Sequence, residues 1–412
     1  MNSHKQIPQI AAIDKLRLTF TAFTKISSSK RDRHVINSSA TNTSLAMQTI
    51  QNFLPLLHRN TFIRGEMEMP CLPAFIDLYM ERLQTLFDTF GKSFSPAEND
   101  HLRSLLLGKL EEGFRTSPLS KLVFRYEPSQ SPNTGITYTI TYTIGSITDQ
   151  YNNWAATKEP PLFGSHADAK VMELAAQIKE QLGRDPYIVD IGAGTGRNTF
   201  PLARMGYQVD ALEMTPAFTE QLQAIAQNEN LPVNVIACDI LNPLTRLKTL
   251  AYNLAICCEV TSHFRDADQL RLLLAKACDY LQHGGLLLFN AFMANEGYEP
   301  SPLDRQVSEL AWSTIFTYQD LHNALDNLPM EIIANDAVLD FERSNLPPEA
   351  WPPTSWFESW STGKDVFPLA DHSPIQLRWI SLMFSGQSIC SNPNSKRSEN
   401  AEMRIDHCLI FF

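Results

Sequence analysis

The sequence has few of the features that mark membrane, nucleic-acid-binding or disulfide-rich proteins. No apolar run reaches the roughly 20 residues that cross a bilayer, so no membrane span is expected. Acidic residues outnumber basic ones, 45 to 34, whereas a general nucleic-acid binder carries a basic face, so no nucleic-acid partner is expected. The seven cysteines are scattered, and no CxxC pairs with a second cysteine or histidine cluster. We therefore expect reduced core thiols and no metal site.

The two ends of the chain differ in composition from the middle. Residues 1–46 are rich in Ser, Thr, Lys and Arg, with only Asp14 and Asp32 as acids, so we expect a disordered extension. An organelle transit peptide is the alternative, because residues 13–20 are faintly amphipathic. Residues 385–412 lose the apolar pattern and are expected to be a disordered tail. We otherwise expect a cytoplasmic protein.

Residues 47–148 are expected to form a small α+β module. Apolar residues recur at helical spacing over 73–90, and Ser95 with Glu98 forms a capping box for a second helix to about 110, which Gly113 ends. Residues 121–126 and 136–144 read as a hairpin, the second strand alternating Ile or Tyr with Thr. The module either packs beside a catalytic sheet, or covers the substrate, or forms a homodimer contact.

The stretch from 187 to 213 organises the rest of the chain. Residues 187–191 are apolar without alternation, which predicts a buried parallel strand. Gly192, Gly194 and Gly196 allow a tight turn, residues 199–205 have helical spacing, and a second strand ends at Glu213. This order of elements, a strand, a glycine turn, a helix and a second strand that ends in an acid, is typical of half of a nucleotide-binding sheet.

The spacing of the glycines favours S-adenosylmethionine (SAM) over a dinucleotide. A dinucleotide site uses GxGxxG so that a pyrophosphate can lie on the helix N-terminus, whereas this turn is GxGxG. Asp190, just before the turn, suits an ammonium group and is a poor neighbour for a pyrophosphate. Glu213 is placed to accept both ribose hydroxyls. A NAD(P)-dependent oxidoreductase remains the alternative.

The same residues carry a resemblance to a known family. The form Gly192-x-Gly-x-Gly-Arg-Asn198, followed by Leu202-Ala203 and Gly206-Tyr207, resembles the class I SAM-dependent methyltransferases, most of all their tellurite-resistance-type branch. Glu259-x-x-x-His263 is similar to the ubiquinone-biosynthesis type. The resemblance covers about 167–292. It implies a Rossmann-like seven-stranded sheet with helices on both faces, over residues 149–384.

The remaining elements are read from periodicity and caps. Ser165, with Asp168 three residues on, is expected to cap a helix that runs to Gly183, and Thr317 a helix to about 328. If a helix begins at Glu259, that carboxylate and His263 share one face; two ligands without a third do not predict a metal. Further helices are expected over 216–227 and 267–282, and strands over 233–238, 253–258, 286–292, 331–341 and 375–384, the last two as an antiparallel hairpin.

The expected cofactor contacts lie at the carboxyl ends of the strands, where ligands of open α/β sheets bind. By resemblance, Asp239 accepts the adenine amino group; a loop-capping aspartate is its alternative. The predicted contacts are Asp190, Gly192, Ala193, Gly194, Gly196, Arg197, Asn198, Glu213, Met214, Asp239, Ile240, Cys258 and Glu259.

Catalytic residues are harder to name, because methyl transfer from a sulfonium mainly needs alignment and uses a base only when the acceptor must lose a proton. We predict His263 as the base, since its ordinary pKa suits neutral pH. The resemblance implies that the segment before the first helix folds over the cofactor. Tyr151 is therefore predicted to orient the acceptor and Trp154 to line its pocket, or both to close over the methionine part; interdomain packing is the alternative. The insertion 344–373 is predicted to cover the acceptor through Trp351, Trp356 and Trp360, or else to be a clamp of buried aromatics.

The sequence therefore predicts an enzyme that transfers a methyl group from SAM to a small-molecule acceptor, aromatic or soft, such as a thiol or metalloid. A non-catalytic SAM-binding regulatory protein, with the N-terminal module as its functional surface, is a further alternative.

Overall fold

The computed structural model describes residues 47–56, 63–129 and 135–386 of the 412. Residues 47–56 are helical and belong to a different compact unit from the chain after Phe62, and each unit is described by itself. The expectations for residues 1–46, and for 387–412 in the tail, lie outside the described residues. Among the helices that the structure describes, none is long and apolar enough to cross a membrane.

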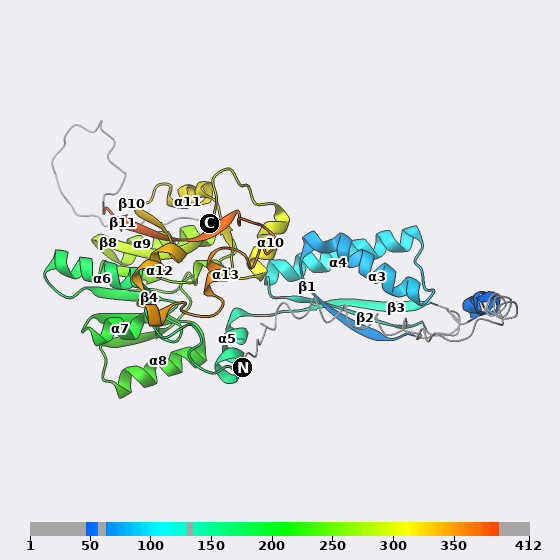
Figure 1. The fold of residues 1–412 in the computed structure, drawn as a ribbon, viewed down its shortest axis with the longest axis horizontal. Coiled ribbons are helices and arrows are strands. Elements are labelled where there is room, and N and C mark those ends of the chain that lie inside the picture. Colours follow the sequence, from blue (N-terminus) through cyan, green and yellow to red (C-terminus); the bar gives the residue numbers. More distant parts are fainter. Residues whose placement is uncertain (1–46, 57–62, 130–134, 387–412) are drawn as a thin grey trace, which may run out of the picture. The chain divides into compact units, whose positions relative to one another are not determined.

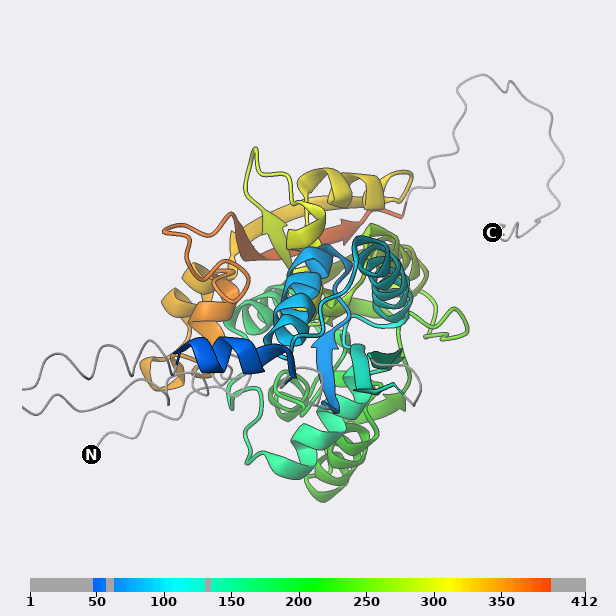
Figure 2. The ribbon, with the colours of Figure 1, turned by 90° about the vertical axis from the view of Figure 1, so that its right-hand side faces the viewer.

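A three-stranded antiparallel sheet lies near the start of the larger unit, in the order β1 (Gly65–Pro70), β2 (Lys121–Pro128) and β3 (Ile136–Thr143). Its helices are α3 (Ile76–Thr89), preceded by the short η1 (Pro73–Phe75), and α4 (Pro96–Thr116), which lie side by side (Figures 1 and 2). The predicted alternation of β3 is observed, with the Ile and Tyr residues half-buried and the threonines exposed. Strand β1 was not predicted, because Gly, Glu and Pro disfavour strands.

Helix α4 does not end at Gly113, as the sequence predicted, but continues to Thr116. Gly113 is buried in the helix, and a Cβ there would come 2.5 Å from Sγ of Cys71, which is itself fully buried. The glycine is therefore needed for the close approach of α4 to Cys71 rather than as a helix terminator.

This contact gives a matched pair of predictions in one helix. Gly113→Ala should lower the free energy of unfolding by about 1–3 kcal/mol, because the added methyl group overpacks the core against Cys71. Gly108→Ala, where nothing lies within 4 Å of the added Cβ, should raise it by about 0.5–1 kcal/mol through helix propensity. Urea unfolding of both variants measures this, and equal effects would contradict the packing explanation.

The main sheet follows the path β10-β11-β8-β7-β4-β5-β6, with the two-residue β9 (Ile315–Phe316) paired beside β8. Figure 1 labels β10, β11, β8 and β4 of this sheet. The strands along this path are parallel except at β11, which is antiparallel to both of its neighbours. This is the predicted Rossmann-like sheet closed by an antiparallel hairpin. Its strands are β4 (Tyr187–Ile191), β5 (Gln208–Glu213), β6 (Val233–Ala237), β7 (Tyr252–Cys257), β8 (Leu281–Ala294), β10 (Met330–Ala337) and β11 (Ile375–Phe384).

Helices cover both faces of this sheet, because successive side chains of the buried strands point to opposite sides. Along β7, Ala255 and Cys257 pack with α9 (Ala267–Tyr280) and α11 (Tyr318–Leu325), whereas Leu254 and Ile256 pack with α6, α7, α12 and α13. The remaining helices are α5 (Ile147–Thr157), α6 (Ala169–Leu182), α7 (Thr199–Arg204), α8 (Pro216–Asn228), α10 (Pro302–Leu310), α12 (Val338–Asn345), α13 (Phe357–Ser361) and the single turns η2 (Thr261–His263) and η3 (Pro348–Ala350).

The start of α6 differs from the prediction. The helix begins at Ala169 with Asp168 at its N-cap, rather than at Ser165. Its first two N–H groups donate to the carboxylate of Glu342, at 2.7 Å from Ala169 and 3.2 Å from Lys170. Glu342 is available because the predicted strand 331–341 ends at Ala337 and turns into α12. A distant carboxylate thus replaces the local cap.

The boundaries of two further elements differ from the prediction. Strand β8 begins at Leu281 and contains the glycine pair that was expected to precede it, so α9 ends at Tyr280. Helix α11 has the predicted cap, Thr317 with Asp320, but ends at Leu325.

Candidate active site

The glycine turn follows β4 and has the backbone that glycine allows. Gly192, Gly194 and Gly196 have φ of 73°, 56° and 84°, where other residues are strained. A Cβ on Gly192 would lie 2.4 Å from Cγ2 of Val260, and one on Gly196 would lie 2.2 Å from the ring of Phe200. The turn is therefore packed tightly on the segment after β7 and on α7.

Glu213 lies at the carboxyl end of β5 and reaches back to this turn. It is only 6% exposed, and its two carboxylate oxygens accept from the N–H groups of Gly194, at 2.8 Å, and Thr215, at 2.7 Å. The predicted ribose acceptor is thus held beside the turn by backbone donors. Its neighbour Met214 is exposed.

The other predicted contacts at this edge differ in accessibility. Asp239 is exposed after β6 and accepts from the N–H of Leu241 at 2.8 Å, which is the loop-capping geometry that the sequence left as an alternative. Ile240 and Cys258 are buried, as is Ala193 within the turn. The adenine role of Asp239 remains a prediction.

Asp190 lies beneath the turn. It is 3% exposed and accepts from Oγ1 of Thr199 at 2.6 Å, and burial raises the pKa of its carboxyl to about 7. The carboxylate therefore braces β4 against the start of α7. Its predicted contact with the SAM ammonium stays a prediction.

Arg197 forms a buried network that joins three segments. Its guanidinium is 8% exposed and contacts Asp168, before α6, at 2.5 Å and Glu259, after β7, at 2.7 Å. Asn198 exchanges two hydrogen bonds with Asp168, both at 2.9 Å. Asp168 thus lies at the N-cap of α6, but its side chain makes no capping hydrogen bond and instead binds the Arg-Asn pair of the motif.

Glu259 does not begin a helix. Its φ is 59°, its N–H donates to Oδ1 of Asn290 at 2.7 Å, and only the turn η2 follows. Glu259 and His263 therefore bind different partners, Arg197 and Tyr151. Within the described ranges, no three His, Cys, Asp or Glu side chains are grouped to hold a metal ion.

A cluster of aromatic side chains surrounds His263; we call it the His263 cluster. Oη of Tyr151, from α5, lies 2.8 Å from Nε2 of His263. The ring of Trp312 lies 5.2 Å from that of His263 and 5.0 Å from that of Trp154. The cluster consists of Tyr151, Trp154, Phe163, Phe218, His263 and Trp312. The structure thus brings Tyr151, Trp154 and His263 together.

The cluster also lies close to the cofactor residues. Phe163 is 3.6 Å from the position of a Cβ on Gly194. Burial raises the pKa of the Tyr151 hydroxyl, and the nearby charges of Glu259 and Glu213 raise it further. Tyr151 therefore contacts His263 within the range of both charges.

The electrostatics of His263 differ from the expectation. Burial lowers the pKa of its imidazole to about 4 instead of leaving it near neutral, because burial disfavours the charged form. Nδ1 is buried and has no hydrogen-bond partner among the described residues. At neutral pH the ring is therefore uncharged, and it is a weaker base than the sequence suggested.

The tryptophans of the insertion lie outside this cluster. Trp360 is 7% exposed and packs edge-on against Phe292 and Trp356, while Trp351 packs against Phe357. This arrangement favours the alternative, a clamp of buried aromatics. One link to the cluster exists, because Nε1 of Trp360 donates to the carbonyl of Trp312 at 3.1 Å.

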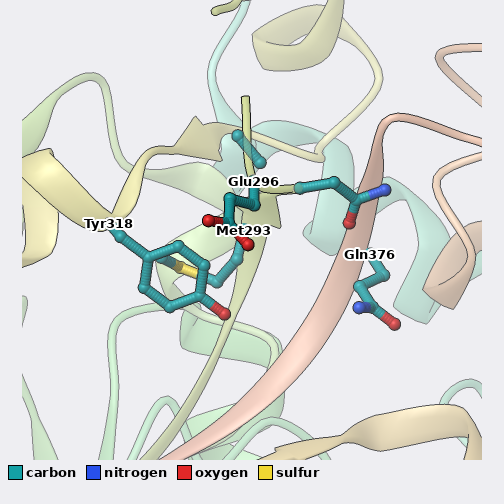
Figure 3. A pocket seen from close by; sticks show the side chains of 6 residues that line it. Met293, Glu296, Tyr318 and Gln376 are labelled. Carbon is teal, nitrogen blue, oxygen red and sulfur yellow. The ribbon is translucent and has the colours of Figure 1, made fainter. Parts of the chain in front are cut away.

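A cavity of about 500 Å³ lies at the carboxyl end of β8 (Figure 3). Its described lining is Met293, Ala294, Asn295, Glu296, Tyr318 and Gln376, among which Glu296 alone is charged. None of these residues belongs to the glycine turn or to the His263 cluster. We assign this cavity no role in methyl transfer.

The sequence did not identify Asp168, Phe163, Phe218 or Trp312 as site residues. Phe163 had a usable signal, since it lies in the segment before the first helix that the resemblance places over the cofactor. Trp312 had none, because it lies in a short connection between α10 and β9 and reaches the cluster only through the fold.

Comparison with known proteins agrees with this geometry. Residues 188–285, from β4 to the glycine pair in β8, match the family described as "Methyltransferase domain". The chain therefore contains a Rossmann-like class I methyltransferase domain, and the protein is a SAM-dependent methyltransferase, as the sequence predicted. This match speaks against the NAD(P) alternative. No curated protein sequence matches the chain.

Solved structures are similar at low identity. Geranyl diphosphate C-methyltransferase from Streptomyces coelicolor A3(2), solved with Mg²⁺, geranyl diphosphate and S-adenosyl-L-homocysteine, is 16% identical, over 58% of this chain and 96% of that chain, with a TM-score of 0.39. A proposed sarcosine dimethylglycine methyltransferase from Galdieria sulphuraria is 13% identical, over 58% of this chain and 99% of that chain, with a TM-score of 0.41. At these scores the structures carry no argument about substrate.

The buried acids predict a pH dependence of cofactor binding. Burial raises the pKa of Asp190 and of Glu259 to about 7, so each is charged above that pH and neutral below it. If the ammonium of S-adenosylhomocysteine (SAH) binds beside these acids, as predicted for Asp190, their charged forms attract it. Its dissociation constant should therefore increase from pH 8 to pH 6, approaching about tenfold per pH unit if one proton is linked.

Calorimetric titration at each pH measures this dependence. Glu259→Gln should flatten it, whereas Asp239→Asn, at the exposed acid, should leave it unchanged. A wild-type affinity that is constant from pH 6 to pH 8 would contradict the role of these carboxylates.

Proposed function

We propose that this enzyme methylates a small-molecule acceptor bound at the His263 cluster. The observation that carries the proposal is the 2.8 Å contact between Oη of Tyr151 and Nε2 of His263, inside a ring of aromatic side chains next to the glycine turn. The Gly-x-Gly-x-Gly-Arg-Asn form supports the tellurite-resistance-type branch, without fixing the acceptor.

The reaction is an in-line displacement. The acceptor atom attacks the methyl carbon of the sulfonium, the new bond to carbon forms as the carbon–sulfur bond breaks, and SAH leaves. Holding the two reactants in line can contribute about 7–11 kcal/mol of the barrier reduction. The aromatic rings exclude water, and their faces attract the positive sulfonium.

His263 and Tyr151 act on the acceptor in this proposal. Because the imidazole is neutral at pH 7, it can accept a hydrogen bond or a proton from a hydroxyl or thiol acceptor. With a pKa of about 4 it holds that proton only transiently, until the products leave and water reaches the ring. The pair therefore contributes mainly by orienting the acceptor, while Tyr151 fixes the ring of His263.

The domain organisation supports this assignment. We propose that residues 149–384 form the catalytic domain and 47–148 an accessory module. The insertion 344–373 acts on the acceptor indirectly, since Trp360 holds the backbone of Trp312, whose φ is 55°. Trp312 rather than Trp351 or Trp356 is then the residue that faces the acceptor.

Transfer of a labelled methyl group from SAM to a phenol, a thiol, an amine and tellurite tests the proposal. We expect turnover of at least one acceptor and a loss of about 10²-fold in kcat/KM for His263→Ala, the cost of a misplaced acceptor. Tyr151→Phe should lose about tenfold, since one hydrogen bond is removed.

Lys364→Gln, at an exposed lysine of the insertion, serves as the control and should keep full activity. Full turnover in both His263→Ala and Tyr151→Phe, with SAH binding intact, would contradict the proposed acceptor site.

A further inference from the structure

A cavity of about 220 Å³ lies on the outer side of the glycine turn; we call it the Lys158 cavity. Three segments enclose it. They are the end of α5 with the chain that follows it, the turn with the start of α7, and Gln221 of α8. The lining includes Lys158, Ser165, Thr195, Arg197, Arg204 and Gln221.

The charges that line this cavity are all positive. Lys158, Arg197 and Arg204 contribute, and no carboxylate is among the described residues of the lining. Two of the three cations already form ion pairs with acids outside the lining. Arg197 is bound to Asp168 and Glu259, and Arg204 uses Nε and Nη2 on Glu229, at 2.7 Å each.

Lys158 is the cation that faces the cavity without an acidic partner. Its Nζ lies 3.5 Å above the ring centroid of Trp154, and none of the ion pairs among the described residues includes it. An ammonium group keeps donors free in such a contact, because a ring face accepts only part of its hydrogen-bonding capacity. Nη1 of Arg204 is also outside the pair with Glu229.

The walls of the cavity are stiff. Pro160, Pro161 and Pro201 restrict the backbone of two sides, and Gly196 has a φ of 84° in the turn. Gly164, in the same segment as Pro160 and Pro161, has a φ of 92°, and a Cβ there would come 2.9 Å from the carbonyl of Pro353. A ligand therefore meets a site that is largely formed in advance, which lowers the entropic cost of binding.

We propose that the Lys158 cavity binds a small oxyanion, the phosphate or carboxylate group of a metabolite, through Lys158 and Arg204. Ser165, Thr195 and Gln221 supply neutral hydrogen-bond donors beside the two cations. The site is additional to the predicted cofactor contacts of Glu213 and to the His263 cluster. Because Gly196 and Arg197 form its wall, its occupant contacts the turn whose inner side holds Glu213.

Calorimetric titration of the full chain with inorganic phosphate, and separately with succinate, at constant ionic strength tests the proposal. We expect saturable binding of at least one of the two, weakened about tenfold or more by Lys158→Gln and by Arg204→Gln, since each removes a charge-assisted hydrogen bond. Lys158→Arg should keep most of the affinity. Lys364→Gln should match the wild type.

The preference between the two probes identifies the source of the oxyanion. Phosphate binding alone indicates a phosphorylated ligand, and succinate binding alone indicates a carboxylate ligand. No saturable binding of either, or equal binding by wild type and Lys158→Gln, overturns the proposal.

A repeat in the presence of saturating SAH separates this site from the predicted cofactor contacts. Retained binding supports an independent site. Competition by SAH overturns it, because the cavity would then hold the carboxylate of the cofactor itself. Neither outcome depends on methyl transfer.

Discussion

The guanidinium of Arg197, buried between Asp168 and Glu259, is the interaction on which the rest of the site depends. It fixes the glycine turn to the start of α6 on one side and to the end of β7 on the other. Breaking a buried ion pair of this kind destabilises the fold, because removing one partner leaves an uncompensated charge away from water. The pairing therefore holds the ends of β4 and β7, where the predicted cofactor contacts lie, in a fixed relation.

The aromatic cluster depends on the same frame. His263 follows Glu259 by one short turn, Phe163 lies on the glycine turn, and Tyr151 connects the two. Trp312 completes the cluster from a separate part of the chain, held by Trp360. The site thus joins a charged half, which suits the amino-acid and ribose parts of SAM, to an aromatic half that surrounds the acceptor in the proposed function.

Sequence patterns predicted the parts of the molecule that are encoded locally. The glycine turn, Glu213 at the end of the next strand and the alternation of β3 all follow from neighbouring residues, and the order of the main sheet follows from the family resemblance. The missed features are non-local. Glu342 caps α6 across more than 170 residues. From the sequence, Asp168 is part of a local helix cap, whereas in the structure it pairs with Arg197. The pKa of His263 also depends on burial, which its neighbours in sequence do not reveal.

The most direct test of the central claim is a calorimetric titration of the full chain with SAH and with NADH, in the wild type and in Glu213→Ala. The account predicts micromolar binding of SAH, at least a tenfold loss in Glu213→Ala, and no binding of NADH. Binding of NADH alone, or SAH binding that does not change in Glu213→Ala, would contradict the assignment of the glycine turn and Glu213 to the SAM site.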